Sequence, residues 1–156
     1  MPAAINLADL YRQLGRESES EGVLRTALTA SPGDAGLHHV LGLTLVRLKR
    51  SGEALEELRR AAEIEPDRAR YAYVYAVALH SGGRTANAIT VLEESLARHP
   101  SDRDTLMALV SFHREVRDID SALKYAEQLA PIIPEDKDLA RLIEDLRWQG
   151  NRPADH

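Results

Sequence analysis

Residues 51–66 read SGEALEELRRAAEIEP, and the pattern of this stretch decides the fold because it returns along the chain. It places small residues at Ala54 and Ala61 around Leu58, at helical spacing, and it ends in a proline. Prolines recur with a step of 34 residues: Pro32, Pro66, Pro100 and Pro134. Proline disfavours a helical conformation in the residue before it, so each of these positions predicts a break between helices. A fixed period of this length is typical of a repeat architecture.

Other columns of the sequence follow the same step. Small residues recur where two helices of a hairpin must approach closely, and larger apolar residues recur where a ridge fills a groove. The small columns are Ala8, Gly42, Ala76, Val110 and Ser20, Ala54, Ala88, Ala122. The larger columns are Leu7, Leu41, Tyr75, Leu109 and Leu24, Leu58, Leu92, Ala126. Their common register predicts four helical hairpins.

Periodicity and helix-breaking residues predict the helices themselves. The first helices of the hairpins are expected at 3–14, 35–48, 69–81 and 103–115, and the second helices at 18–30, 52–64, 86–98 and 119–130. Gly15, Ser51-Gly52 and Gly82-Gly83 are expected in the turns, whereas the fourth turn has Arg117-Asp118 and no glycine. Pro131 should disturb the end of the eighth helix. A ninth amphipathic helix is expected over 135–148, covering the last hairpin.

At these columns the chain resembles the tetratricopeptide repeat family, whose 34-residue pattern reads W-x2-L-G-x2-Y, A-x3-F, A, P. The resemblance covers residues 1–136, although the tryptophan column holds Ala4, His38, Ala72 and Leu106. It implies an all-α fold, a right-handed α-solenoid of antiparallel helix hairpins. The implied repeats are 1–34, 35–68, 69–102 and 103–136, followed by a capping helix at 137–150. Residues 1–150 would form one continuous domain, and 151–156 a disordered tail.

Composition excludes several classes of protein. The 156 residues carry a net charge of −5 and no stripe of basic residues, so nucleic acid is not an expected partner. The absence of cysteine excludes disulfides and Cys-ligated zinc. The longest uncharged stretch, 71–81, is too short to span a bilayer, and the first residues lack the features of a signal peptide. The compartment is unknown, with the cytoplasm as the default.

The family resemblance also implies where a partner would bind. In this family the first helix of each hairpin lines a concave wall, and the corresponding positions here have an apolar middle with polar residues towards one edge. The expected groove residues are Arg12, His39, Leu43, Arg47, Arg70, Tyr73, Val77, His80, Met107, Ser111 and Arg114. The alternative for Val40, Val74 and Val77 is that they only pack between adjacent first helices. A clamp for a C-terminal carboxylate is not expected, because Arg70 alone matches its basic columns.

Catalytic and metal chemistry is not expected from the sequence. His38 and His39 are adjacent and point about 100° apart on a helix, so they cannot readily share an ion. The numerous carboxylates fit a solvated face with weak ion pairs. No catalytic residue, metal site or cofactor is therefore predicted.

Two functions remain open at this point. The first is a non-catalytic scaffold that binds a peptide or a helix of another protein in the groove. The second is a structural or self-associating module of a larger protein, such as an enzyme or a multihaem cytochrome, which could form a homodimer through the array ends. Because the first repeat begins at Met1, the chain fits both a short natural array and a fragment of a longer protein, and we favour the fragment.

Overall fold

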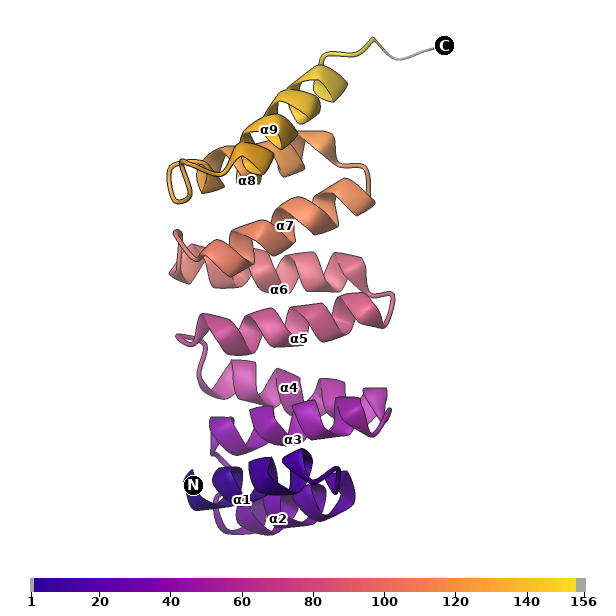
Figure 1. The fold of residues 1–156 in the computed structure, drawn as a ribbon, viewed down its shortest axis with the longest axis vertical. Helices are drawn as coiled ribbons and strands as arrows, with labels where there is room; N and C mark the ends of the chain where they lie inside the picture. The colour runs from indigo at the N-terminus through magenta and orange to yellow at the C-terminus, as the bar shows by residue number, and fades with distance from the viewer. Residues whose placement is uncertain (1, 154–156) are drawn as a thin grey trace. The chain divides into compact units, whose positions relative to one another are not determined.

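A computed structural model describes residues 2–153 of the chain, and these residues form helices, turns and no strand. The all-α fold expected from the sequence is confirmed. The chain divides into two compact units, Met1–Arg84 and Thr85–His156, which are described separately below. Figure 1 shows the helices in chain order.

Unit 1 contains five helices that pack in sequence. These are α1 (Pro2–Gln13), α2 (Glu17–Ala30), α3 (Ala35–Arg47), α4 (Ser51–Ile64) and α5 (Ala69–Ser81). Each helix contacts the next one along the chain, and the contact between α3 and α4 is the most extensive. Unit 1 therefore consists of two helical hairpins followed by one further helix (Figure 1).

Unit 2 contains four helices with the same sequential packing. These are α6 (Thr85–Arg98), α7 (Arg103–Glu115), α8 (Ile119–Leu129) and α9 (Lys137–Gly150). Contacts join α6 to α7, α7 to α8 and α8 to α9. The ninth helix thus covers the hairpin of α7 and α8, and it does so through Leu139, Ile143 and Leu146, which are buried.

The four prolines of the 34-residue period all lie in turns between helices, as the sequence predicts. The bounds of the helices agree with the prediction within one or two residues at each end. At Pro131 the predicted disturbance is also present, because α8 ends at Leu129 and the residues that follow are turns. Residues 151–153 follow α9 outside the helix, and residues 154–156 of the predicted disordered tail lie outside the described residues.

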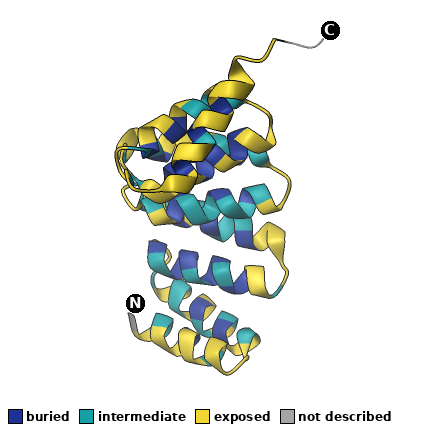
Figure 2. Cartoon of the chain, turned by 45° about the horizontal axis from the view of Figure 1, so that its top comes forward, coloured by how far each residue is buried: buried dark blue, intermediate teal, exposed yellow. Residues whose placement is uncertain are grey.

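The core of each unit is built from the repeating columns, and Figure 2 shows its buried residues on the inward sides of the helices. In unit 1 the side chains of Leu24, Leu41 and Leu58 are completely buried. Gly42 lies so close to α4 that a β-carbon at this position would be 2.6 Å from Cγ of Leu58. This contact confirms that the small column marks the close approach of two helices of a hairpin.

All four first helices end in the same turn, in which one residue adopts a positive φ. This residue is Gly15, Lys49, Gly83 and Arg117 in the successive repeats. The amide of the next residue donates to a carbonyl five residues back, for example from Arg50 to Leu45 at 2.9 Å, which is the Schellman arrangement. The prediction of Ser51-Gly52 as turn residues was wrong, because both belong to α4 and Lys49 supplies the left-handed residue. In the fourth turn, which contains no glycine, Arg117 is the residue with the positive φ.

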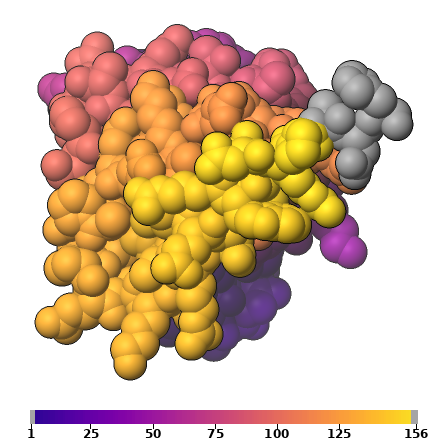
Figure 3. Space-filling model, turned by 90° about the horizontal axis from the view of Figure 1, so that it is seen from above, coloured from indigo at the N-terminus to yellow at the C-terminus, as the bar shows by residue number. Residues whose placement is uncertain are grey.

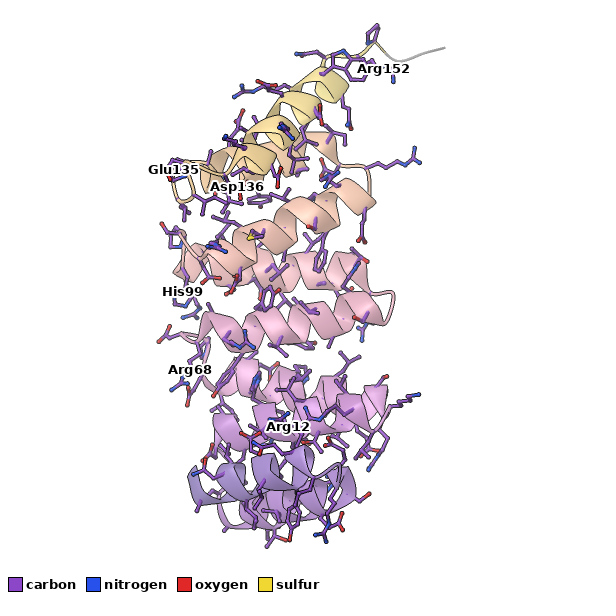
Figure 4. The ribbon with its side chains drawn as sticks, in the orientation of Figure 1. Arg12, Arg68, His99, Glu135, Asp136 and Arg152 are labelled. Atoms are coloured by element: carbon purple, nitrogen blue, oxygen red, sulfur yellow. The ribbon has the colours of Figure 1, made fainter. Side chains whose placement is uncertain are left out.

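The helices that follow the periodic prolines begin with a second recurrent feature. Asp34, Asp102 and Asp136 cap α3, α7 and α9, and each carboxylate accepts a hydrogen bond from the amide three residues later. The same position before α5 holds Arg68, whose side chain makes no capping hydrogen bond. Figure 4 labels Arg68 and Asp136 in their turns.

Candidate binding surfaces

The predicted groove residues of unit 1 come from α1, α3 and α5. Two of them, Leu43 and Val77, line an apolar pocket of about 240 Å³ between α3, α4 and α5. Val46 and Val74 complete the walls from α3 and α5, and Leu55 and Leu58 of α4 lie beneath. Side chains of Ser51 and Ser81 are the polar groups of its lining.

The lining of this pocket tests the alternative that Val40, Val74 and Val77 only pack between adjacent first helices. Val40 packs against the core of unit 1 and does not line the pocket, as the alternative expects. Val74 and Val77 line the pocket and are only half-buried. Packing between the helices therefore leaves part of the apolar surface of Val74 and Val77 exposed. A concave apolar site with few polar groups is suited to an aliphatic or aromatic side chain of a ligand.

His39, predicted to reach the groove, is instead buried. Its ring packs against Tyr71 of α5 with centroids 4.6 Å apart and the ring planes tilted by 33°, and its Nδ1 atom has no hydrogen-bond partner within the described residues. Burial, followed by the positive charge of Arg70, lowers the pKa of His39 to about 4. At neutral pH the imidazole is therefore uncharged, and it packs as part of the contact between α3 and α5.

The three predicted arginines of unit 1 differ in their partners. Arg12 donates to Asp9 of its own helix at 3.2 Å, and it is labelled in Figure 4. Arg47 donates to Glu17 of α2 at 2.9 Å, so its charge is compensated inside unit 1. Arg70 is exposed, and the structure gives it no ion pair among residues 2–153. It is the predicted groove arginine of unit 1 that keeps its charge available.

Tyr73 and His80 are the remaining predicted groove residues of unit 1. Both lie on α5 and are half-buried, but neither lines the apolar pocket. Tyr73 follows Arg70 by one helical turn and precedes Val77 by another, so these three residues share one side of α5.

The predicted residues of unit 2 also meet in a cavity. Met107, Ser111 and Arg114 of α7 line a hollow of about 200 Å³, whose other side is formed by Leu139 and Leu142 of α9. Asp136 and Asp138 lie at its border. Met107 is 44% exposed, and the structure gives Arg114 no ion pair within the described residues. In Figure 3, atoms of α9 are among the yellow atoms at the surface.

The contribution of α9 to this cavity was missed by sequence reasoning, which treated the helix only as a cap. Leu142 belongs to the apolar stripe of α9, yet it is only half-buried, whereas Leu139, Ile143 and Leu146 are buried. The side of α9 that carries Leu142 is therefore partly exposed and lines the cavity. No feature of the sequence shows which residue of such a stripe stays partly exposed.

Two further histidines, His38 and His113, are buried in the core. His38 is buried between Glu57 Oε2 at 2.5 Å and the carbonyl of Pro32 at 2.8 Å. In unit 2, His113 is buried against Tyr125, with Glu93 and Asp118 at 3.5 and 3.4 Å from its ring nitrogens. Within residues 2–153 no group of three or more His, Asp and Glu side chains could hold a metal ion.

None of the described helices is both long and apolar enough to cross a bilayer. The charged residues of the second helices form ion pairs with one another, as in the network of Arg25, Arg50, Glu21 and Glu53 between α2 and α4. These exposed pairs fit the solvated face expected from the sequence.

Solved structures similar to this chain share its fold at low sequence identity. A crystal structure of MamA protein has a TM-score of 0.79 and 19% identity, covering 93% of this chain and 79% of that one. MamA from Desulfovibrio magneticus RS-1, residues 41 to the end, has a TM-score of 0.76 and 15% identity, covering 96% and 85%. YrrB, described as a TPR protein with an unusual peptide-binding site, has a TM-score of 0.72 and 21% identity, covering 92% and 73%.

Comparison at the level of sequence gives the family. No curated protein sequence matches the chain. Two family models do match it, both described as tetratricopeptide repeat, one over residues 3–36 and the other over residues 39–103. Together with the 34-residue step of the prolines and the sequential packing of helices in each unit, these matches show that the chain belongs to the tetratricopeptide repeat family.

Proposed function

We propose that this chain is a non-catalytic scaffold that binds a peptide or a helix of another protein on the side of α3 and α5 that carries the apolar pocket. The observation that carries the proposal is the pocket itself, where Leu43, Val46, Val74 and Val77 leave apolar surface open to a ligand. A partner side chain that fills it would remove this surface from water, which contributes roughly 25 cal/mol per Å².

The charge of Arg70 supports a second contact on the same side. Arg70 and Val77 are seven residues apart on α5, which corresponds to two helical turns or about 10 Å. With Arg47 and Arg12 already paired, Arg70 is the predicted arginine of unit 1 that could meet a carboxylate. We therefore expect a ligand that carries an acidic group about 10 Å from an aliphatic or aromatic side chain.

Similarity to YrrB agrees with this proposal, since the description of that protein names a peptide-binding site. In unit 2 the cavity of Met107, Ser111 and Arg114 also combines apolar residues with a hydroxyl group, and its lining adds the charged side chains of Arg114, Asp136 and Asp138. It is a candidate for a further contact with the same class of ligand.

The proposal can be tested with peptides selected by the chain itself. A phage-displayed library of random peptides would be panned against the full chain, and the selected peptides would be titrated by fluorescence polarisation. The test variant is Val46→Lys, and the control is Ile64→Lys. Both residues are β-branched, lie at the end of a helix and are similarly exposed, at 47% and 42%, but only Val46 lines the pocket.

We expect Val46→Lys to raise Kd at least tenfold, because the ammonium group enters an apolar site, while Ile64→Lys leaves Kd unchanged. A Lys at the C-terminal end of a helix is compatible with the helix dipole in both variants. Arg70→Ala should weaken the peptides that contain an acidic residue, and this loss should shrink at high salt. Equal binding of selected peptides to wild type and Val46→Lys would contradict the proposal.

A further inference from the structure

Helix α1 carries large apolar side chains that unit 1 does not cover. Leu7 is 41% exposed, Leu10 50%, and Leu14, in the turn directly after α1, 60%. The spacing of three and four residues places them on one side of the helix. Ala8, on another side of α1, is buried in the core with Leu24. The three leucines, which we call the α1 leucine face, therefore point away from the core of unit 1.

Among the described residues of α1, no formal charge lies on this face. The charged residues of the helix are Asp9 and Arg12, which pair with each other at 3.2 Å. At 100° per residue they lie about 130° or more around the helix from the middle of the leucines. Within α1, the exposed polar residues nearest to the leucines around the helix are the neutral Asn6 and Gln13. Arg16, which follows the helix, lies over the ring of Tyr11 and pairs with Glu19. A surface that covers the leucines should accordingly be uncharged as well.

A second copy of the chain could cover the α1 leucine face either with the end of its unit 2 or with its own α1 leucine face. The need for an uncharged surface distinguishes these two arrangements. Contact between the α1 leucine face and the end of unit 2 would place the leucines on α9, whose exposed residues include Lys137, Arg141 and Glu144. Those charges would lose water without gaining partners, which is costly. Contact between two α1 leucine faces buries only apolar and neutral polar groups.

The spacing of the leucines fits a twofold arrangement. In an antiparallel pair of α1 helices centred on Leu10, the Leu10 side chains of the two copies face each other. Leu7 then comes within one residue of facing Leu14 of the second copy, an offset of about 1.5 Å along the helix axis, because Leu7 is three residues before Leu10 and Leu14 is four residues after it. A surface that is complementary to itself in this way suits the isologous contact of a twofold dimer.

We infer that two copies of this chain associate through their α1 leucine faces, with the two α1 helices antiparallel and Leu10 at the twofold axis. One pair of helices makes a small interface, at the lower end of those found between proteins, below about 1,200 Å². The dimer is therefore weak and depends on protein concentration. It leaves the pocket between α3, α4 and α5 free, so dimer formation and peptide binding are independent of each other.

The inference is tested by sedimentation velocity of the full chain between about 5 and 500 μM. Wild type should pass from monomer to dimer with concentration. Leu10→Lys and Leu10→Glu should each stay monomeric, because like charges would meet at the axis. An equimolar mixture of the two variants should recover the dimer, and the recovery should weaken with salt.

The control is Val116→Lys, at a residue of unit 2 that is 51% exposed, and it should dimerise like wild type. Circular dichroism would establish that each variant keeps its helices, which is expected because Leu10 is half exposed. The inference is overturned if wild type is monomeric throughout the range, which would assign the face to a different protein or a lipid surface. It is also overturned if Leu10→Lys dimerises like wild type, or if mixing the two charged variants fails to restore the dimer.

Discussion

At the scale of single residues, two glycines inside helices of unit 1 have opposite surroundings. A β-carbon at Gly22 of α2 would have no other group within 4 Å, whereas at Gly42 of α3 it would meet Leu58 at 2.6 Å. The cost of glycine in a helix is the same at both positions, about 1 kcal/mol relative to alanine. The difference between them is therefore the packing of α3 against α4.

Alanine substitutions at these glycines should change stability in opposite directions. Gly22→Ala should raise the free energy of unfolding by about 0.5–1 kcal/mol. Gly42→Ala should lower it by about 1 kcal/mol, because displacing Leu58 costs more than the gain in helix propensity. Urea unfolding of both variants provides the comparison. Equal stabilisation by both would mean that α3 and α4 are not in close contact at Gly42.

His39 provides a second prediction for one residue. Its pKa of about 4 in the folded chain is below the value of 6.5 for an exposed histidine, so the unfolded chain binds more protons between these pH values. The contribution of neutral His39 to stability is complete above pH 6.5 and is lost as pH falls towards 4. Between pH 7 and 4.5 this loss amounts to roughly 2 kcal/mol.

His39→Phe keeps an aromatic ring against Tyr71 and removes the titrating group. Its free energy of unfolding should fall less than that of wild type between pH 7 and 4.5, by about the 2 kcal/mol just given. Urea unfolding at the two pH values measures both losses. If wild type and His39→Phe lose the same amount, His39 is not held in its neutral form by the fold.

Residues also show where prediction from the sequence ends. In the turn between α3 and α4, the presence of Gly52 suggests that this glycine adopts the positive φ. The residue that does so is Lys49, which stands 34 residues after Gly15 and 34 before Gly83. A residue with a side chain can adopt this conformation at a cost of about 1–2 kcal/mol. Choosing the glycine was therefore wrong, because a step of 34 residues from Gly15 leads to Lys49.

At the scale of helices, capping aspartates mark where α3 and α7 begin. The carboxylate of Asp102 accepts hydrogen bonds from the amide of Thr105 at 3.0 Å and from its hydroxyl at 2.6 Å. Such a cap satisfies a backbone donor that the helix leaves free.

Asp102→Ala should therefore lower the free energy of unfolding by about 1 kcal/mol. As a control, Arg103→Ala changes the exposed neighbouring residue and should have a smaller effect. Thermal unfolding followed by circular dichroism measures both. A loss in Asp102→Ala no larger than in Arg103→Ala would show that the cap does not stabilise α7.

Helices were the part of the structure most open to prediction. Four prolines at one step and the small columns between them are enough to predict the order of α1 to α8 and their approximate bounds. The second role of α9 could not be predicted in this way. Its apolar stripe predicts that one side is covered, but the angle at which it meets α8, and hence the hollow beside Leu142, depends on packing between helices.

At the scale of the whole molecule, each of the two units contains one of the candidate cavities. The family resemblance implies a single concave wall, from which eleven residues were predicted to face a ligand. Five of them line cavities: Leu43 and Val77 in unit 1, and Met107, Ser111 and Arg114 in unit 2. That these five residues contact a ligand stays a prediction. The columns of the family could not show that Arg47 is paired with Glu17 or that His39 is buried, because both depend on side chains from other helices.

Binding of a ligand to the pocket between α3, α4 and α5 is the central claim, and it can be mapped directly. A selected peptide would be titrated into the full chain labelled with ¹⁵N, and the amide chemical shifts would be followed by NMR. The account predicts that the largest changes cluster at Leu43, Val46, Val74 and Val77, with changes at Arg70 when the peptide is acidic. Changes confined to the α1 leucine face or to the charged outer side of α4, with none at these four residues, would contradict it.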